Sequence, residues 1–351
     1  MSLSYLYTPD FLSQTLTVIS VIALPIHILG AYCILMKTPK IMNSVKWIML
    51  NLHFWSVMLD WGITFFTKPF VLFPAMGGVA LGVLSDLGVG TGEQIYLVVT
   101  LFCIVCAAIV SIFENRYYLS FGQNSCWRHY RIPCMLFNYF LAFLIFLPAY
   151  LNAPDQATGL QKLHDNLPEL PERIRRMPIY VIAIDFSLVV GPVVLMGVLI
   201  IAEALAFVVL IFLGASKALR ERTVSINCVI IQKKFLRALY IQILMILLNM
   251  GVPLCYLGVA VPLHYYNQAA NNIIFIIYSL HGVSSTIVMI WLHKPYRAVI
   301  QNFFRRSHAR RLSNVGTDHR KSMFEGKTAT NMPSTVNIRI QYNVNILNVV
   351  V

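Results

Sequence analysis

Seven long runs of apolar residues dominate this chain and constrain its fold more than any other feature. They occupy residues 14–36, 47–73, 94–113, 134–151, 186–213, 235–262 and 271–292. About 20 helical residues cross the hydrocarbon core of a bilayer, so each run is close to that length or above it. Hydrophobic residues make up 58% of the sequence and charged residues only 12%, about half of what a soluble domain carries. The sequence therefore predicts an all-α integral membrane protein, a bundle of seven transmembrane helices.

The basic residues lie on one side of the predicted membrane. Of the 27 Lys and Arg, 22 fall in the first, third and fifth loops or after Leu292, and five fall on the other side. Cytoplasmic loops carry the excess of Lys and Arg, so we expect the N-terminus outside the cell and the C-terminus inside. The net charge of +13 follows from this placement. We therefore expect the lipid bilayer, and no nucleic acid, as the partner of these charges.

The charge and hydropathy pattern divides the chain into four parts. Residues 1–13 form an extracellular N-terminus and residues 14–292 the bundle. Residues 295–306 place aromatic and aliphatic side chains at helical spacing against arginines, a pattern typical of an amphipathic helix on the membrane surface. Residues 307–351 are polar and basic, which predicts a disordered cytoplasmic tail. In that tail Ser313 follows Arg310 and Arg311, a spacing that suits a basophilic kinase; an unmodified tail is the alternative.

None of the seven cysteines falls in a loop that we place outside, so we expect no structural disulfide. We also expect no bound metal and no cofactor. The outer loop over residues 152–178 holds four prolines and mixed charges, and it is long enough to cover the mouth of a pocket. Without a cysteine to fasten it, we expect this loop to be more mobile, or held by helix packing alone.

Polar side chains inside the apolar runs are the first candidates for a ligand pocket. Each costs free energy in a membrane unless it faces a cavity or a partner. The candidates are Asp60, Glu203, Asn249, Tyr278 and His281. Tyr278 and His281 are one turn apart and can share a face of the seventh helix. The alternative for each residue is an interhelical hydrogen bond that holds the bundle together.

Several short motifs, in order, resemble the nematode serpentine receptors of class H (Srh). They are LPIHILGAYC (24–33), KTP (37–39), NLHFW (51–55), FENRY (113–117), QKKFLRAL (232–239) and HKPYR (293–297). The resemblance runs from about residue 24 to residue 297. It implies a G-protein-coupled chemoreceptor of the cell membrane, including that of sensory cilia. Its partners would be a small-molecule chemical ligand and a heterotrimeric G protein.

The resemblance also implies a signalling switch at the cytoplasmic end of the third helix. Glu114, Asn115, Arg116 and Tyr117 are similar to the acid-Arg-Tyr switch of rhodopsin-like receptors, although Asn115 stands where the acid precedes the arginine. A guanidinium is always charged and offers five donors to a docking helix, so Arg116 is the expected contact with the G protein. Otherwise Arg116 marks only the inner membrane surface.

A second switch candidate lies where the seventh helix ends. Pro295, Tyr296 and Arg297 occupy the place of the Asn-Pro-x-x-Tyr motif without its asparagine or its spacing. The alternative role of Pro295 is to begin a new helix, since proline is favoured in a first helical turn.

Three function classes compete. A receptor accounts for the seven helices, the basic inner side and the ordered motifs. A multi-pass transporter or a ligand-gated channel is the alternative, and it predicts internal repeats or more ionisable residues along a pore. An enzyme is the least supported class, because the sequence contains none of the motifs HExxH, GxSxG or GxGD.

Overall fold

A computed structural model describes residues 3–220, 241, 244, 248–249, 251–302 and 305. Five of its helical segments are long and apolar enough to cross a membrane, counting only this part of the chain. They are Pro9–Lys37, Thr91–Gly122, Trp127–Leu151, Ser187–Ala218 and Gln268–Leu292. Large apolar side chains stay exposed along these helices, as at Val21, Phe137 and Phe212. Contiguous exposed apolar surface of this kind belongs against lipid, so the chain is a helical membrane bundle.

The helices begin and end at ordinary local signals. Thr8 caps the first span by accepting a hydrogen bond from the Phe11 N–H, with Pro9 in the first turn. Asn267 caps α11 in the same way. The helical elements are η1 (Leu3–Tyr7), α1 (Pro9–Lys37), η2 (Lys40–Met42), α2 (Asn43–Trp61), η3 (Gly62–Thr67), α3 (Val83–Asp86), α4 (Thr91–Tyr117), η4 (Tyr118–Gly122), α5 (Trp127–Leu144), α6 (Leu147–Leu151), α7 (Gln156–Asn166), α8 (Glu172–Arg175), α9 (Ser187–Arg220), α11 (Gln268–Ser279) and α12 (His281–Leu292). The strands are β1 (Pro69–Val71), β2 (Gly77–Ala80) and β3 (Tyr180–Val181).

Two of the predicted apolar runs differ from the observed helices. The run over residues 47–73 is helical only as far as Thr67, through α2 and the π-helical turn η3, and its last residues form β1. The seventh run is broken at Leu280 into α11 and α12. The first half of the sixth run, before Gly251, lies mostly outside the described residues, and Gly251–Ala260 is its described apolar helix.

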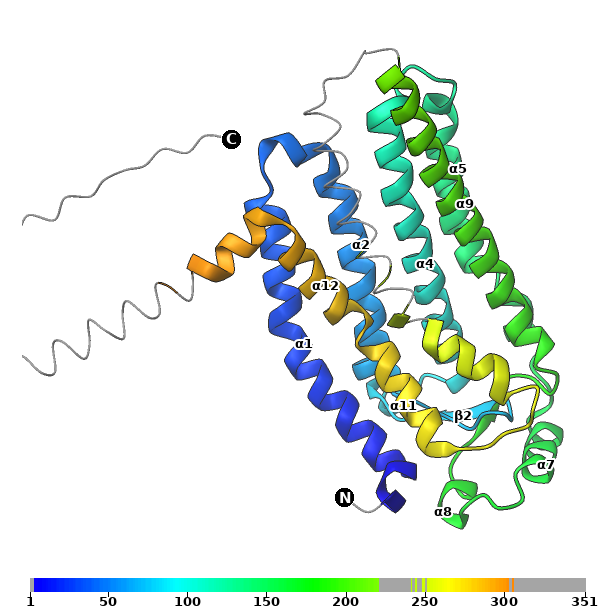
Figure 1. The fold of residues 1–351 in the computed structure, drawn as a ribbon. Coiled ribbons are helices and arrows are strands. Elements are labelled where there is room, and N and C mark those ends of the chain that lie inside the picture. The colour runs from blue at the N-terminus through cyan, green and yellow to red at the C-terminus, as the bar shows by residue number, and fades with distance from the viewer. Residues whose placement is uncertain are drawn as a thin grey trace, which may run out of the picture. The chain divides into compact units, whose positions relative to one another are not determined.

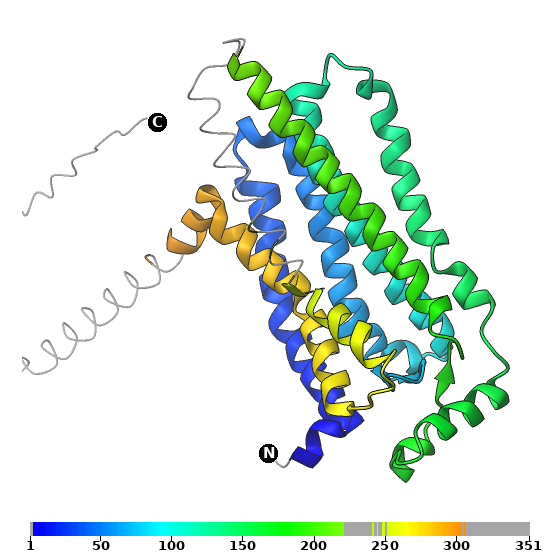
Figure 2. The ribbon, with the colours of Figure 1, turned by 45° about the vertical axis from the view of Figure 1, so that its right-hand side comes forward.

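Helix α4 lies at the centre of the bundle (Figures 1 and 2). It packs against α2, α5 and α9, and most of its side chains in the membrane are buried. Helices α1, α2 and α12 pack against one another as a second group. Gly30 permits the close approach inside this group, because a Cβ there would come within 2.6 Å of Thr286 and 2.8 Å of His53.

A small antiparallel sheet, in the order β1-β2-β3, lies at the same end of the bundle as η1 (Figure 1). We call this the sheet end. The outer loop after α6 supplies β3 and the two short helices α7 and α8. These elements have their own apolar core with the first turns of α1, which includes Leu12, Leu16, Phe70, Leu163 and Ile174.

The chain bends at His293 after α12 and is helical again over residues 294–299. Residues 300–351 form a separate unit, of which residues 300–302 and 305 are described as helical. Ser313 and the predicted tail lie outside the described residues.

Candidate functional site: a cavity beneath the sheet

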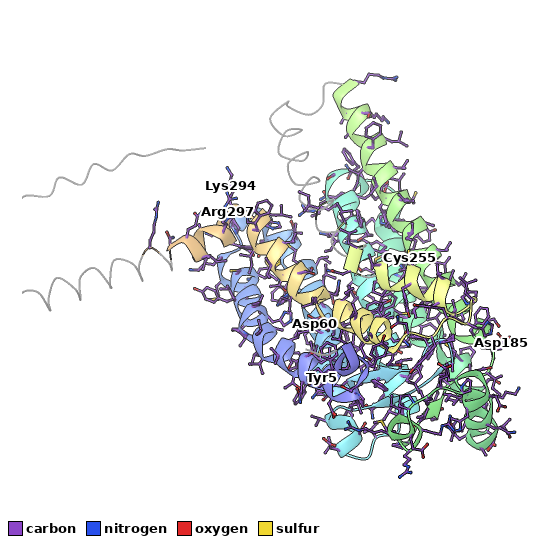
Figure 3. All side chains as sticks on the ribbon, turned by 60° about the horizontal axis from the view of Figure 1, so that its bottom comes forward. Tyr5, Asp60, Asp185, Cys255, Lys294 and Arg297 are labelled. Carbon is purple, nitrogen blue, oxygen red and sulfur yellow. The ribbon has the colours of Figure 1, made fainter. Side chains whose placement is uncertain are left out.

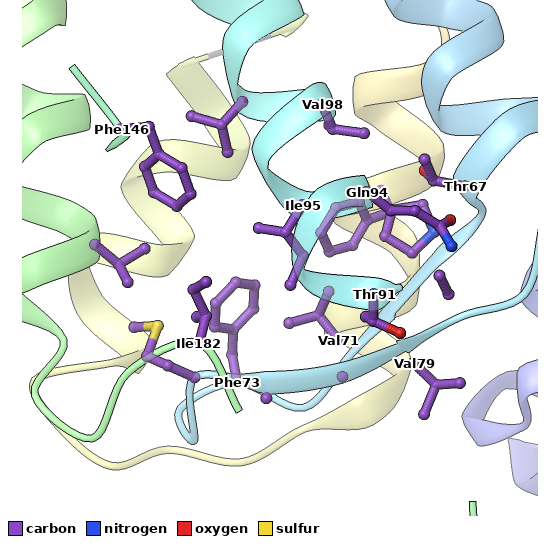
Figure 4. Close-up of a pocket in the computed structure, with 18 residues that line it drawn as sticks. Thr67, Val71, Phe73, Val79, Thr91, Gln94, Ile95, Val98, Phe146 and Ile182 are labelled. Atoms are coloured by element: carbon purple, nitrogen blue, oxygen red, sulfur yellow. The ribbon is translucent and has the colours of Figure 1, made fainter. Parts of the chain in front are cut away.

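An apolar cavity of about 160 Å³ lies between the sheet and the membrane helices (Figure 4). Its walls come from the sheet and its turn, from α4, α9 and α11, from the end of η3 and from Phe146 just before α6. The lining residues are Thr67, Pro69, Val71, Phe73, Met76, Gly77, Gly78, Val79, Ala80, Thr91, Gln94, Ile95, Val98, Val99, Phe146, Ile182, Val189 and Phe275. No Lys, Arg, Asp, Glu or His is among them.

The sheet forms the roof of the cavity because its side chains alternate between two faces. Val71 and Ile182 line the cavity, whereas Phe70 and Val181, one residue earlier, belong to the apolar core beneath α7 and α8. Successive side chains of a strand point to opposite faces, so three short strands can serve both regions. The glycines of β2 let the strands approach: a Cβ on Gly78 would lie 2.6 Å from the Phe70 carbonyl oxygen.

The cavity wall opposite the roof is one face of α4. Thr91, Gln94, Ile95, Val98 and Val99 line it, and their spacing of three and four residues places them on one side of a helix. Gln94 is fully buried, and its amide nitrogen donates to Ser85 Oγ at 3.0 Å and to the Val89 carbonyl at 2.8 Å. A carbonyl can only accept, so this contact fixes which end of the amide faces Val89. Gln94 Oε1 has no hydrogen-bond partner among the described residues.

The outer loop is fastened to the bundle by backbone pairing. Strand β3 pairs with β2, with Gly77 opposite Val181. On its free edge, Gln156 of α7 acts as a further strand partner: its amide accepts from the Val181 N–H at 2.9 Å and donates to the Val181 carbonyl at 3.1 Å. The expectation that helix packing alone holds this loop is therefore wrong. Through β3 the outer loop forms part of the roof of the cavity, which agrees with the prediction that this loop covers the mouth of a pocket.

Three buried amides at the start of α11 bind the other side of the roof. Gln268 donates to the Val71 carbonyl at 3.1 Å, Asn271 to that of Phe73 at 3.0 Å and Asn272 to that of Leu6 at 2.8 Å. Buried carbonyl groups need hydrogen-bond donors, and these three amides supply them to β1, to the turn after it and to η1. They also join the N-terminal segment, β1 and the seventh run.

None of the five predicted ligand residues lines the cavity. Asp60 is instead part of a buried polar junction, which we define as His27, His53, Asp60, Thr286 and Gly282, from α1, α2 and α12. Asp60 accepts hydrogen bonds from the N–H groups of Gly282 at 2.9 Å and Val283 at 3.0 Å. His27 Nε2 lies 3.2 Å from Asp60 Oδ2. Figure 3 shows Asp60 inside the bundle.

Asp60 thus caps a helix that begins inside the bundle. The break at Leu280 releases the first N–H groups of α12, and no side chain of its own segment caps them. A carboxylate near a helix N-terminus is favoured by the helix dipole and by charge-assisted hydrogen bonds. The Asp60 carboxylate packs so closely on Gly282 that a Cβ there would collide with it.

Two of the other candidates form interhelical hydrogen bonds. Glu203 on α9 accepts from the Asn138 amide on α5 at 2.6 Å. Asn249 donates to Ser284 Oγ, and Ser284 in turn donates to the His281 carbonyl at 2.9 Å. These contacts match the alternative stated for such residues, a polar bond between helices.

Tyr278 and His281 lie on either side of the break at Leu280. A shared helical face for the two requires a continuous helix, which is absent there. The Tyr278 ring packs against Phe102 and against the cavity residue Phe275. His281 is fully buried, and its ring nitrogens have no hydrogen-bond partner among the described residues.

At the opposite end of the bundle, Glu114 is held by α5. Its carboxylate accepts from Trp127 Nε1 at 2.8 Å and from Arg131 Nη2 at 3.0 Å, and the Glu114 side chain is almost fully buried. Asn115 Oδ1 accepts from the same arginine nitrogen at 3.4 Å. The Arg131 guanidinium also stacks 3.7 Å above the Tyr118 ring. The acid of the predicted switch motif is therefore engaged by Arg131 in this structure.

The remaining switch candidates lie near the end of α12. Burial lowers the pKa of His293, a hydrogen bond to the Met289 carbonyl raises it, and the charge of Arg116 lowers it again. Tyr296 is fully buried against the His293 ring, and its hydroxyl lies 2.6 Å from Thr38 Oγ1. Pro295 lies in the first turn of the helix over residues 294–299, with Arg297 exposed.

Tyr117 packs against Phe207 of α9, with 6.0 Å between the ring centroids. It therefore belongs to the α4–α9 contact.

The cavity residues were missed because they are mostly apolar. A signal was present in the stripe from Thr91 to Val99, where four aliphatic or threonine side chains and Gln94 recur at helical spacing. The same stripe is expected of any core-facing helix, so it could not distinguish a pocket from packing.

Comparisons with known proteins agree with the motifs. The profile of the family described as "Serpentine type 7TM GPCR chemoreceptor Srh" matches residues 7–306. The chain is also 25% identical over 320 residues to serpentine receptor class H-72 of Caenorhabditis elegans, an alignment that covers 86% of this chain and 88% of that protein.

Proposed function

The chain belongs to the Srh family of serpentine chemoreceptors, and from that premise we propose that it binds a small external chemical in the cavity beneath the sheet and activates a heterotrimeric G protein from the opposite end of the bundle. The observation that carries the proposal is the roofed cavity, at the end of the bundle that holds the N-terminal segment. Apolar, largely preformed pockets of this kind are the usual ligand sites of proteins.

We place the sheet end outside the cell and the Arg116 end inside. The 22-to-5 division of Lys and Arg supports this orientation. Seven spans then comprise the five long helices, the segment of α2 and η3, and the sixth run that includes Gly251–Ala260. The helix after α12 would lie on the inner membrane surface.

On the inner side we assign Arg116 the contact with the G protein. Glu114 is held by Trp127 and Arg131 of α5, so release of Arg116 does not require breaking an Arg116–Glu114 pair. Tyr296 closes the same end by its bond to Thr38. Movement of α12 relative to α1 would open that contact, which makes Pro295, Tyr296 and Arg297 the accompanying switch segment.

The assay is ligand-dependent nucleotide exchange on a purified heterotrimeric G protein, with the receptor in lipid nanodiscs. The Arg116→Ala variant should lose exchange while keeping surface expression and ligand binding. Arg128→Ala, which removes an exposed arginine from the same side, is the matched control and should signal normally. Full signalling by Arg116→Ala refutes the switch role. Uptake of a labelled solute without nucleotide exchange would instead support a transporter.

A further inference from the structure

The cavity beneath the sheet also indicates which chemical class it accepts. We infer that its ligand is an uncharged, hydrocarbon-rich molecule of about one aromatic ring, recognised by shape. This inference rests on the proposed receptor function and concerns the same site. It differs from the sequence-based expectation of a pocket built around Asp60, Glu203 and His281.

The first argument is charge. Among the described residues that line the cavity, none has an ionisable side chain, and the polar side chains are one amide and two hydroxyls, those of Gln94, Thr67 and Thr91. An ion that entered would lose its hydration without gaining a counter-charge, which costs far more than the contacts return. Ionic ligands are therefore excluded from this cavity.

The second argument is that two of the three polar side chains, those of Thr67 and Gln94, already form hydrogen bonds within the protein. The Thr67 hydroxyl donates to the Gly62 carbonyl at 2.8 Å. The Gln94 amide nitrogen is used by Ser85 and Val89. Gln94 Oε1 is itself buried inside the wall. No Lys or Arg stands among the described lining residues, so nothing there can neutralise a ligand carboxylate.

The third argument is size and shape. An engineered apolar cavity of about 150 Å³ stays dry and binds benzene, and this cavity has about 160 Å³. Three phenylalanines bound it: Phe73 in the turn of the sheet and Phe146 just before α6, both labelled in Figure 4, and Phe275 on α11. Aromatic walls favour a ring held edge to face.

The test is ligand-induced thermal stabilisation of the full-length receptor in nanodiscs, without G protein. The probes are ethylbenzene and benzylammonium, which share a ring and differ in charge. We expect ethylbenzene to raise the Tm of the wild type saturably and benzylammonium to produce no shift. An equal or larger shift with benzylammonium, or no shift with either probe, overturns the inference.

Variants locate the binding. Val98→Phe fills the cavity and should weaken ethylbenzene binding by more than about tenfold. Val194→Phe adds the same group to the lipid-exposed face of α9, where Val194 is 54% exposed, and should bind as the wild type does. Equal binding by the two variants contradicts the site.

A second variant keeps the inference testable if Val98→Phe fails to fold. Phe275→Ala enlarges the cavity and should shift preference toward naphthalene over ethylbenzene by about tenfold. An unchanged preference in a folded Phe275→Ala receptor overturns the inference. If these binding tests fail while ligand-dependent nucleotide exchange persists, the ligand class is wrong and the receptor function stands.

Discussion

The cavity beneath the sheet and the polar junction around Asp60 lie in one bundle and differ in both polarity and free volume. The cavity has about 160 Å³ of space, and none of the described residues in its walls has an ionisable side chain. The junction packs two histidines and a carboxylate together, and the space beside His53 is only about 10 Å³. A water molecule alone needs that much. The polar residues of the junction join helices, whereas the cavity is enclosed mostly by apolar residues.

The largest effect that tests this comparison is expected from Asp60→Ala. It leaves His27 and the Gly282 and Val283 N–H groups without their shared partner inside the membrane. Removing one partner of a buried charged group costs about 3–5 kcal/mol, enough to abolish most surface expression. Cell-surface labelling and Tm in detergent measure the loss.

Asp60→Asn is the matched control for that experiment. Its amide oxygen can still accept from one N–H group, so it should recover part of the expression that Asp60→Ala loses. If Asp60→Ala folds normally and changes only which ligands are bound, the contrast between junction and cavity is wrong, because Asp60 would then belong to the ligand site.

The next effect concerns the close packing inside the junction. Gly282→Ala places a methyl group against the Asp60 carboxylate, which must move and lose its hydrogen bonds to α12. Overpacking of this kind costs about 1–3 kcal/mol, which thermal unfolding in detergent can resolve. Gly197→Ala is the control, since a Cβ on Gly197 meets nothing within 4 Å. Equal Tm values for the two variants would mean that the junction tolerates displacement of Asp60.

The sequence predicted the membrane helices well because their signal is local and strong. Hydropathy alone located the runs that became α1, α4 and α9 to within a turn or two at most ends. It failed where tertiary contacts decide the structure. Residues 69–71 belong to an apolar run long enough for a span, yet they form β1, because their partners in β2 and α11 supply the hydrogen bonds.

The site was harder to predict than the fold for a physical reason. Glu203 and Asp60 were selected because burial of a polar group needs a partner, and the partners are Asn138 and the start of α12. No pattern in one sequence tells a helix partner from a ligand. The break of the seventh run at Leu280 could not be predicted either, since no proline or charged residue stands at that position.

A smaller effect is expected at the roof of the cavity. Gln156→Ala removes both hydrogen bonds to Val181 and should weaken the attachment of β3 by about 1–2 kcal/mol. Hydrogen exchange at the Val181 amide should accelerate, and ethylbenzene should dissociate faster, with overall Tm little changed. Arg176→Ala is the control, because its exposed pair with Glu172 contributes at most a few tenths of a kcal/mol. Unchanged exchange in Gln156→Ala would show that strand pairing alone holds the roof.

The smallest effect should come from Glu203→Gln. This variant decides whether Glu203 only forms a hydrogen bond between helices or belongs to the ligand site. Glutamine keeps an acceptor for the Asn138 amide, so stability should change by less than about 1 kcal/mol. Ligand dose–response in the nucleotide-exchange assay should be unchanged. Glu203→Ala removes the acceptor and should lower Tm, again without altering which ligands are recognised. A shifted dose–response in a Glu203→Gln receptor of normal Tm would instead give the carboxylate a role in signalling. The contrast between polar residues that join helices and an apolar cavity would then no longer hold for α9.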